Sequence, residues 1–349
     1  MTPCTGDVLC LMFTVAMMFL FATADFLGPV IRGLSLSLGA LAGLLLVPCL
    51  TLLAETLAAA LRPPQPQSVR SALPDSVTVA VLVPAHNEEA GIQQTLESIA
   101  EGLRPQDKLL VVADNCSDNT APLARATGAV VIERFNQEQR GKGYALDHGL
   151  SHLRTAPPDI VVFVDADCNI APNSLPRLAQ MALVTGRPVQ ANYLIEQPAQ
   201  QSLKGAVSAF AVRVKNFVRP LGLRRLGAPC LLTGTGIALP WASAVAVNIA
   251  SSHIVEDMKW GLDLAIHGHP PIFLPEALVT SRLPDADQAA KVQRTRWEHG
   301  HLQMLTSYTP KLLWQGLRQG SPNLLALALE LSILPLSLLV MVWTGITAI

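Results

Sequence analysis

The feature that most restricts the fold is an alternation of short apolar strands with helical segments between residues 77 and 164. The expected strands are rich in Val, Ile and Leu, whereas apolar side chains between them recur at helical spacing. Strands that alternate with helices in this way form a parallel sheet covered by helices on both faces. The sequence therefore predicts an α/β domain with strands over Val77–Val83, Lys108–Ala113, Ala129–Glu133 and Ile160–Val164 and helices over Asn87–Ala100, Thr120–Thr127 and Tyr144–Leu153.

Apolar residues are concentrated at the two ends of the chain, in the runs Val8–Phe26, Leu34–Leu61 and Leu324–Ile349. Each run approaches or exceeds the ~20 residues that cross the core of a bilayer. A cleaved signal peptide is the alternative for the first run. However, Asp7 stands where a basic segment is expected, and a second apolar run follows at once. We therefore expect a helical hairpin before the α/β domain and one helix after it.

The apolar runs and a segment rich in Pro, Gln and Ser divide the chain into five expected parts. We predict a transmembrane hairpin over 1–61, a linker over 62–76, an α/β domain over 77–303, an interfacial segment over 304–323 and a transmembrane helix over 324–349.

Basic residues near the ends of the apolar runs predict the orientation of the chain in a membrane. Only Arg32 lies between the first two runs, whereas Arg62 and Arg70 follow the second and Lys311 and Arg318 precede the third. Lys and Arg are enriched on the cytoplasmic side of membrane proteins. The chain is thus predicted to be a multi-pass protein of the plasma (inner) membrane with a cytosolic α/β domain.

Composition argues against two classes of protein. The net charge of −1 offers no basic surface for nucleic acid. The six cysteines form no CxxC pair, which argues against a zinc site or a disulfide framework. The pairs His267/His269 and His299/His301 have no companion Cys cluster, and we interpret them as a surface turn and an interfacial helix.

Acidic side chains follow two of the expected strands. Asp114 ends the strand Lys108–Ala113, and Asp165 and Asp167 follow the strand Ile160–Val164. Carboxylates placed one residue apart repel each other unless a cation lies between them, and oxygen ligands suit Mg²⁺ or Mn²⁺. A solvated polar turn is the alternative for an isolated Asp-x-Asp. Ligands of parallel sheets bind beyond the carboxyl ends of the strands, which favours a functional site here.

A second acidic pair, Glu256 and Asp257, opens an expected helix. Acidic residues at a helix start can interact with the helix dipole alone. Alternatively, one of them accepts a proton from an attacking hydroxyl as a general base. The residues leave both interpretations open.

The order of these pieces resembles the family 2 glycosyltransferases with the GT-A fold. The resemblance covers about residues 77–303 and rests on Val81–Glu89 (VLVPAHNEE), Asp114, Asp165-Ala166-Asp167, Thr233–Gly236 (TGTG), Glu256-Asp257 and Gln293–Trp297 (QRTRW). The last motif is similar to the Q-(Q/R)-x-R-W of membrane-bound members such as cellulose, chitin and hyaluronan synthases and ceramide glucosyltransferases. The resemblance implies a metal-dependent, inverting transfer of a sugar from a nucleotide-sugar, usually a UDP-sugar.

The resemblance also implies roles for individual residues. The nucleotide-sugar would be bound by Ala85, Glu88, Asp114, Lys142 and Asp165, and Mg²⁺ or Mn²⁺ by Asp165 and Asp167. The catalytic pair would be Glu256 and Asp257, with Asp257 as the base, and the junction of donor and acceptor would be lined by Thr235, Gln293, Arg296 and Trp297. Two departures from the family pattern are His86, where Tyr is common, and the reduction of the first acidic pair to Ala113-Asp114.

Several functions remain open at this level. A polysaccharide synthase of an exopolysaccharide or cell-envelope pathway, with export subunits as partners, is the leading hypothesis. A single-addition enzyme that glycosylates a lipid or a lipid-linked acceptor is the alternative, and a non-catalytic membrane scaffold is a third. A sugar nucleotidyltransferase would carry a glycine-rich loop, which residues 84–89 lack. Residues 203–226 and 297–317 are amphipathic and suit either a membrane surface, in contact with lipid, or packing against the sheet.

Overall fold

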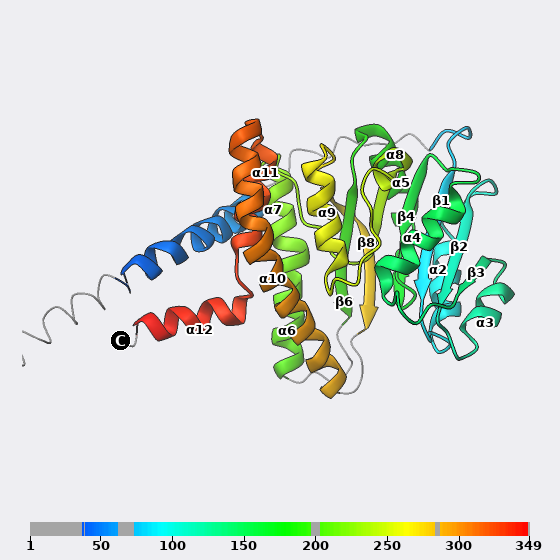
Figure 1. Cartoon of the computed structure of the whole chain (residues 1–349), viewed down its shortest axis with the longest axis horizontal. Coiled ribbons are helices and arrows are strands. Elements are labelled where there is room, and N and C mark those ends of the chain that lie inside the picture. The colour runs from blue at the N-terminus through cyan, green and yellow to red at the C-terminus, as the bar shows by residue number, and fades with distance from the viewer. Residues whose placement is uncertain (1–36, 38, 62–72, 197–202, 283–286, 348–349) are drawn as a thin grey trace, which may run out of the picture. The chain divides into compact units, whose positions relative to one another are not determined.

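The computed structural model describes residues 37, 39–61, 73–196, 203–282 and 287–347. The expected run Val8–Phe26 and most of the linker 62–76 lie outside the described residues. Within residues 50–336 the strands form one mixed sheet (Figure 1). Its order is β3 (Val130–Arg134), β2 (Lys108–Asp114), β1 (Val79–Ala85), β4 (Ile160–Phe163), β7 (Ile237–Pro240), β6 (Val189–Glu196), β8 (Ile272–Arg282) and β5 (Cys168–Ile170).

The first four strands confirm the expected alternation. β1 pairs in parallel with β2 and β4, and β2 pairs in parallel with β3. The helices between them are α2 (Ile92–Ala100), α3 (Thr120–Ala126) and α4 (Lys142–Leu153). The first helix begins later than expected, because Asn87 has a φ of 56°. That left-handed conformation cannot be part of a right-handed helix.

The other strands depart from an all-parallel arrangement. β7 is antiparallel to both β4 and β6, and β5 is antiparallel to β8. β6 and β8 are parallel, with an irregular register between Ala191 and Asn192. The sheet is therefore mixed, but β3, β2, β1 and β4 are parallel neighbours, and the carboxyl ends of β1, β2 and β4 lie at the same edge.

Two apolar layers hold the sheet between helices. On one face, Ile92, Leu96 and Ile99 of α2 pack with α5 (Ser174–Thr185) against the strands. On the other face, α4 and α9 (Glu256–Ile266) cover the sheet, and the rings of Phe163 and Trp260 meet edge to face at 5.2 Å between centroids. Strands buried on both faces explain the continuous Val and Leu runs of the sequence.

Further helices lie between the last strands in the chain and after them. α6 (Leu203–Arg213), the π-helical turn η1 (Val214–Val218) and α7 (Arg219–Arg225) are consecutive. The short helix α8 is Trp241–Ala244, and α10 (Asp287–Gln319) is one helix that continues through residues 303 and 304. The buried face of α10 and of α11 (Pro322–Ser332) packs against α9 through Met258, Leu262, Met304 and Leu327.

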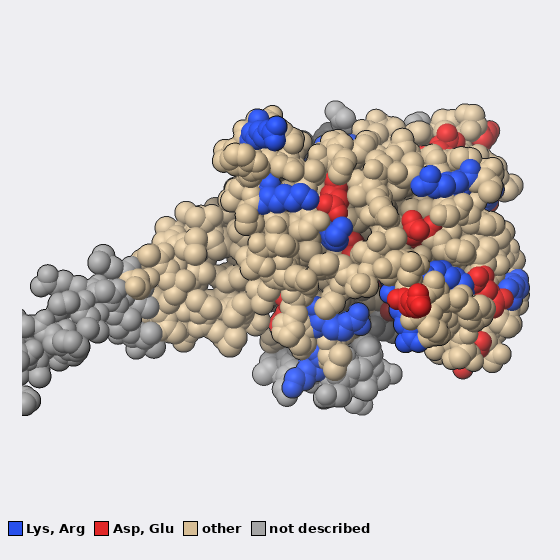
Figure 2. Space-filling model, in the orientation of Figure 1, with Lys and Arg blue, Asp and Glu red and all other residues tan. Residues whose placement is uncertain are grey.

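One described helix, Gly39–Ala60, is long and apolar enough to cross a membrane. Apart from Glu55 it carries no charged residue (Figure 2). Near the carboxyl end, α11 and α12 (Leu336–Thr347) are long and apolar enough to cross a membrane only when taken together, and they are bent by 67°. Pro335 separates them, and the residue before a proline disfavours helical conformation. The expected run 324–349 is thus two helices.

A buried ion cluster joins three helices within residues 50–336. Arg219 of α7 lies 3.1 Å from Oε2 of Glu55 and 2.8 Å from Oε1 of Glu330 on α11. A Cβ on Gly222 would lie 2.0 Å from the carbonyl oxygen of Glu55, so glycine allows the two backbones to touch. Arg219 therefore connects two buried acidic side chains at this contact.

Replacing Arg219 with Met should lower the free energy of unfolding by about 3–5 kcal/mol, because two buried acidic side chains would lose their basic partner. Arg125→Met is the matched control, since Arg125 and its partner Glu133 are largely exposed and such pairs contribute about 0–1 kcal/mol. Thermal denaturation of both variants in detergent measures the difference. Equal losses of stability would contradict a special role for Arg219.

Candidate functional site

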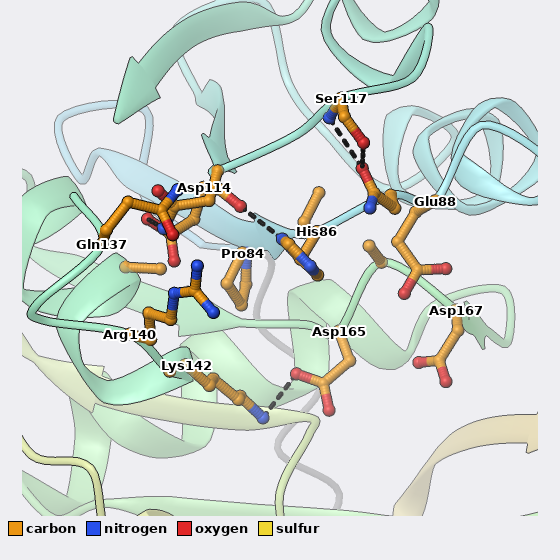
Figure 3. Close-up of a pocket in the computed structure, with 16 residues that line it drawn as sticks. Pro84, His86, Glu88, Asp114, Ser117, Gln137, Arg140, Lys142, Asp165 and Asp167 are labelled. Carbon is orange, nitrogen blue, oxygen red and sulfur yellow. Dashed lines mark hydrogen bonds and ion pairs between the residues drawn. The ribbon is translucent and has the colours of Figure 1, made fainter. Parts of the chain in front are cut away.

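The carboxyl ends of β1, β2 and β4 open into a cavity of about 690 Å³. It is lined by Pro84, Ala85, His86, Asn87, Glu88, Asp114, Asn115, Ser117, Gln137, Arg140, Gly141, Lys142, Ala145, Asp165, Ala166 and Asp167. Every residue expected to bind the nucleotide-sugar or the metal is in this lining. Figure 3 shows Asp114 at one end of the cavity and Glu88, Asp165 and Asp167 at the other.

Asp114 is held in place from two sides. Its Oδ1 lies 2.6 Å from a guanidinium nitrogen of Arg134, and both side chains are about nine-tenths buried. Its backbone carbonyl oxygen is 2.7 Å from Nδ1 of His86 (Figure 3). Arg134 also donates to the carbonyl oxygen of Gln139 and lies over the ring of Tyr144. Arg134 was not predicted as a site residue from the sequence. The only indication was its basic side chain at the end of the third strand.

The other end of the cavity is strongly acidic. Asp165, Asp167 and Cys168 each offer one ligand atom within 4.8 Å of the others. Burial, followed by the charges of Asp167 and Asp165, raises the pKa of Glu88 to about 7. Burial also raises the pKa of Asp165. Such crowding of negative charge favours a bound cation.

The donor set fits a hard divalent cation. Carboxylate oxygens are the ligands that Mg²⁺ and Mn²⁺ prefer. Burial raises the pKa of the Cys168 thiol, which therefore stays protonated and is a poor ligand for these ions. Asp165 and Asp167 are accordingly the residues that would hold a cation here.

Lys142, the first residue of α4, connects two parts of the site. Its Nζ lies 2.5 Å from Oδ1 of Asp165 and donates to the carbonyl oxygen of Gly234 at 2.6 Å. Burial lowers the pKa of Lys142, but the charges of Asp165, Glu256 and Asp257 outweigh it and the pKa is raised. The ammonium group thus stays charged between the carboxylate of Asp165 and the loop 233–236.

The loop 233–236 is held by hydrogen bonds to β6 of the sheet. Gln190 of β6 accepts from the backbone N–H of Thr233 and donates to the carbonyl oxygen of Thr235. The fully buried Thr235 accepts from the backbone N–H of Asp165 at 3.0 Å. Thr235 therefore positions the backbone of Asp165, and it does not line the cavity.

Asp257 lies beside the same loop. A Cβ on Gly234 would be 3.7 Å from Oδ2 of Asp257 and 3.9 Å from Oδ2 of Asp165. The φ of Gly234 is +77°, so a side chain would be strained there. The structure thus brings together the two acidic pairs, which are about 90 residues apart in the sequence.

Glu256 is the first residue of α9 and directly precedes Asp257. Burial, followed by the charge of Asp257, raises the pKa of Glu256 to about 7. Because the folded-state pKa is above the unfolded value, Glu256 destabilises the fold increasingly as the pH rises from about 4.5 to 7.

Glu256→Gln should therefore stabilise the metal-free protein relative to the wild type at pH 8, by on the order of 1–3 kcal/mol, and leave it unchanged near pH 4.5. Thermal denaturation across this pH range in EDTA is the measurement. The exposed Glu97→Gln is the control and should show no such trend. A stability difference that is constant with pH would refute the argument.

The remaining expected residues lie on α10. Gln293 and Trp297 are half-buried and Arg296 is exposed. None of the three is in the lining of the cavity that the described residues form. The Oε1 of Gln293 is buried without a hydrogen-bond partner there. Their role at a junction of donor and acceptor stays a prediction.

Comparison with known proteins agrees with this arrangement. Residues 74–300 match the family model described as "Glycosyltransferase like family 2". The low-salt glycan biosynthesis hexosyltransferase Agl6 of Haloferax volcanii is 35% identical over 106 residues, which is 30% of this chain and 24% of that protein. Glucosyl-3-phosphoglycerate synthase of Mycobacterium tuberculosis is 37% identical over 122 residues, 32% of this chain and 36% of the relative. The matches thus span about a quarter to a third of these curated relatives.

The fold is also similar to that of a solved structure over most of the chain. The mannosyltransferase PcManGT from Pyrobaculum calidifontis, in complex with GDP-Man and Mn²⁺, superposes with a TM-score of 0.59. The superposition covers 85% of this chain and 79% of that one at 19% identity. At this identity the likeness establishes a shared GT-A fold.

Proposed function

Because this chain belongs to glycosyltransferase family 2, we propose that it transfers a hexosyl group from a nucleotide-sugar to a hydroxyl group, with inversion at the anomeric carbon. The donor is proposed to be a UDP-sugar. The acceptor is a polysaccharide or a lipid-linked molecule at the cytosolic face of the plasma membrane, in the assembly of exopolysaccharide or cell envelope.

One observation carries the proposal: a single cavity is lined by Asp114, Lys142, Asp165 and Asp167, and Gly234 lies close to both Asp165 and Asp257. The end at Asp114 presents a carboxylate oxygen for an N–H of a nucleobase, since Arg134 contacts only Oδ1 among the described residues. The acidic end suits a diphosphate bound through a cation. The two ends of the cavity would thus bind the nucleobase and the diphosphate of one nucleotide-sugar.

The chain's own residues account for the proton and the leaving group. Asp257 accepts the proton of the acceptor hydroxyl as its oxygen attacks the anomeric carbon. The new carbon–oxygen bond forms while the bond from that carbon to the diphosphate breaks, and the nucleoside diphosphate leaves with the bonding electrons. Lys142 offsets negative charge on that leaving group. A bound Mg²⁺ or Mn²⁺ would neutralise the diphosphate further.

The membrane part of the proposal is supported by the helix Gly39–Ala60 and by α10. Leu313, Trp314 and Leu317 of α10 are 40%, 68% and 70% exposed, with Lys311 and Arg318 nearby. Exposed Trp and Leu beside basic residues are typical of a segment in the headgroup region. A surface of this kind would bring a lipid-linked acceptor to Asp257, whether one sugar or many are added.

The test is hydrolysis and transfer by the purified protein across UDP-, GDP- and other nucleotide-sugars, with Mn²⁺, Mg²⁺ or EDTA. We expect one donor to be consumed only with a divalent cation. Product length then separates a polymer synthase from a single-addition enzyme. Absence of turnover with every donor, together with tight nucleotide binding, would instead support the scaffold.

A further inference from the structure

His86 lines the cavity between the two ends that the proposed function assigns to the nucleobase and to the diphosphate (Figure 3). Asp114 lies on one side of its ring, and Glu88, Asp165 and Asp167 lie on the other. In a nucleoside diphosphate the base and the diphosphate are joined by a pentose. His86 is therefore placed where the pentose of the donor would lie.

The ring of His86 is attached to the turn that follows the neighbouring strand. Asn87 after β1 and Asn115 after β2 both have left-handed conformations, with φ of 56° and 53°. The two turns are hydrogen-bonded to each other, because Oδ1 of Asn87 accepts from the backbone N–H of Ser117 at 2.8 Å. Nδ1 of His86 lies 2.7 Å from the carbonyl oxygen of Asp114. One ring nitrogen thus fixes the imidazole to the second turn.

This contact assigns the roles of both ring nitrogens. A carbonyl oxygen only accepts, so Nδ1 of His86 carries a proton and donates it to Asp114. In the neutral imidazole the other nitrogen, Nε2, then has a lone pair and is an acceptor. Nε2 has no hydrogen bond to another described residue, and the side chain is exposed. The ring therefore brings an acceptor without a protein partner to the cavity.

An acceptor at this position suits only one of the three parts of a nucleoside diphosphate. The diphosphate itself offers acceptors, which would repel the lone pair of Nε2. An N–H of the base is matched by Oδ2 of Asp114, since Arg134 and Asn115 both bind Oδ1. The hydroxyl groups of a ribose are donors and lie between base and diphosphate. A ribose hydroxyl is thus the group that Nε2 of His86 can bind.

We propose that Nε2 of His86 accepts a hydrogen bond from a hydroxyl group of the donor's ribose and thereby selects ribonucleotides over deoxyribonucleotides. This selection rests on the proposed nucleotide-sugar function and narrows the donor to sugars carried by a ribonucleoside diphosphate. His stands here where Tyr is common in the family. The contact is therefore a property of this chain and is not implied by its family.

The experiment measures binding of UDP, 2′-deoxy-UDP and 3′-deoxy-UDP to the full chain in detergent by calorimetry, with Mn²⁺ at pH 8. The same three forms of GDP are titrated in parallel. The wild type should bind at least one deoxy form about 2- to 10-fold more weakly than its parent, the range for loss of one hydrogen bond. A loss with the 2′-deoxy form would also exclude dTDP-sugars as donors, because they lack that hydroxyl.

Two variants separate the two ring nitrogens. The amide nitrogen of Asn is as many bonds from Cβ as Nδ1, so His86→Asn can still donate to Asp114 but has nothing in place of Nε2. The longer His86→Gln brings an amide oxygen to about the position of Nε2. His86→Asn should bind the parent and the deoxy forms equally, whereas His86→Gln should retain the preference. His152→Asn is the matched control, since His152 is exposed and outside the cavity lining.

Three results would overturn the role of His86. Equal binding of the parent and both deoxy forms by the wild type would mean that no ribose hydroxyl is bound. A preference that survives in His86→Asn would come from another residue. If His86→Asn weakened all three forms equally and kept the preference, His86 would only support Asp114. Failure of every form of UDP and GDP to bind would instead contradict the proposed function itself, so the two failures are distinct.

Discussion

Replacing Asp257 with Asn should lower kcat of sugar transfer by a factor of about 10² to 10⁴, the range for removing a general base. Asn has nearly the same shape as Asp but cannot take the proton of the acceptor hydroxyl. Asp257 is outside the lining of the nucleotide cavity, so nucleotide binding should change little. Initial rates of transfer and the dissociation constant of the nucleoside diphosphate measure the two quantities.

The matched control is Asp263→Asn on the same helix. Asp263 binds Lys259 and Tyr308 and is outside the cavity lining, so kcat should stay close to that of the wild type. If Asp257→Asn kept full activity, the base would have to be another group. Glu256, whose pKa is raised to about 7, would be the next candidate for the general base.

A second large effect is expected at the metal site. Asp167→Asn should weaken binding of Mn²⁺ by at least about 100-fold, since residues that only orient a ligand already contribute ~10- to 100-fold. Asp167 is exposed and is paired with no basic residue among the described positions, so its charge is available to a cation. Electron paramagnetic resonance of free Mn²⁺ in a titration with protein and nucleotide gives the affinity directly.

Cys168→Ser is the control for this titration. The thiol lies 3.4 Å from Oδ1 of Asp167 but is buried and protonated, so its loss should leave Mn²⁺ binding intact. A large loss in Cys168→Ser would mean that sulfur is a ligand and that the ion is softer than Mg²⁺ or Mn²⁺. Unchanged Mn²⁺ binding in Asp167→Asn would remove Asp167 from the site.

Much of the candidate site could be predicted because its signals are local. Val79–Ala85 and Ile160–Phe163 are apolar runs that read as buried strands, and the polar residues directly after them lie at one sheet edge. This is why Asp114, Asp165 and Asp167 could be assigned to one cavity from the sequence. The antiparallel β7 and the bend at Pro335 gave weaker signals, since short apolar runs do not reveal their pairing partners.

The sequence by itself determined the alternation of strands and helices and the acidic residues at the strand ends, because periodicity and strand termination depend on near neighbours. Only the tertiary structure decided that Lys142 reaches Gly234, that Arg134 holds Asp114 and that Arg219 joins Glu55 to Glu330. These contacts connect residues 20 to 164 positions apart. Side chains so distant meet only when the sheet and its helices have packed, and that packing energy has no local signature in the chain.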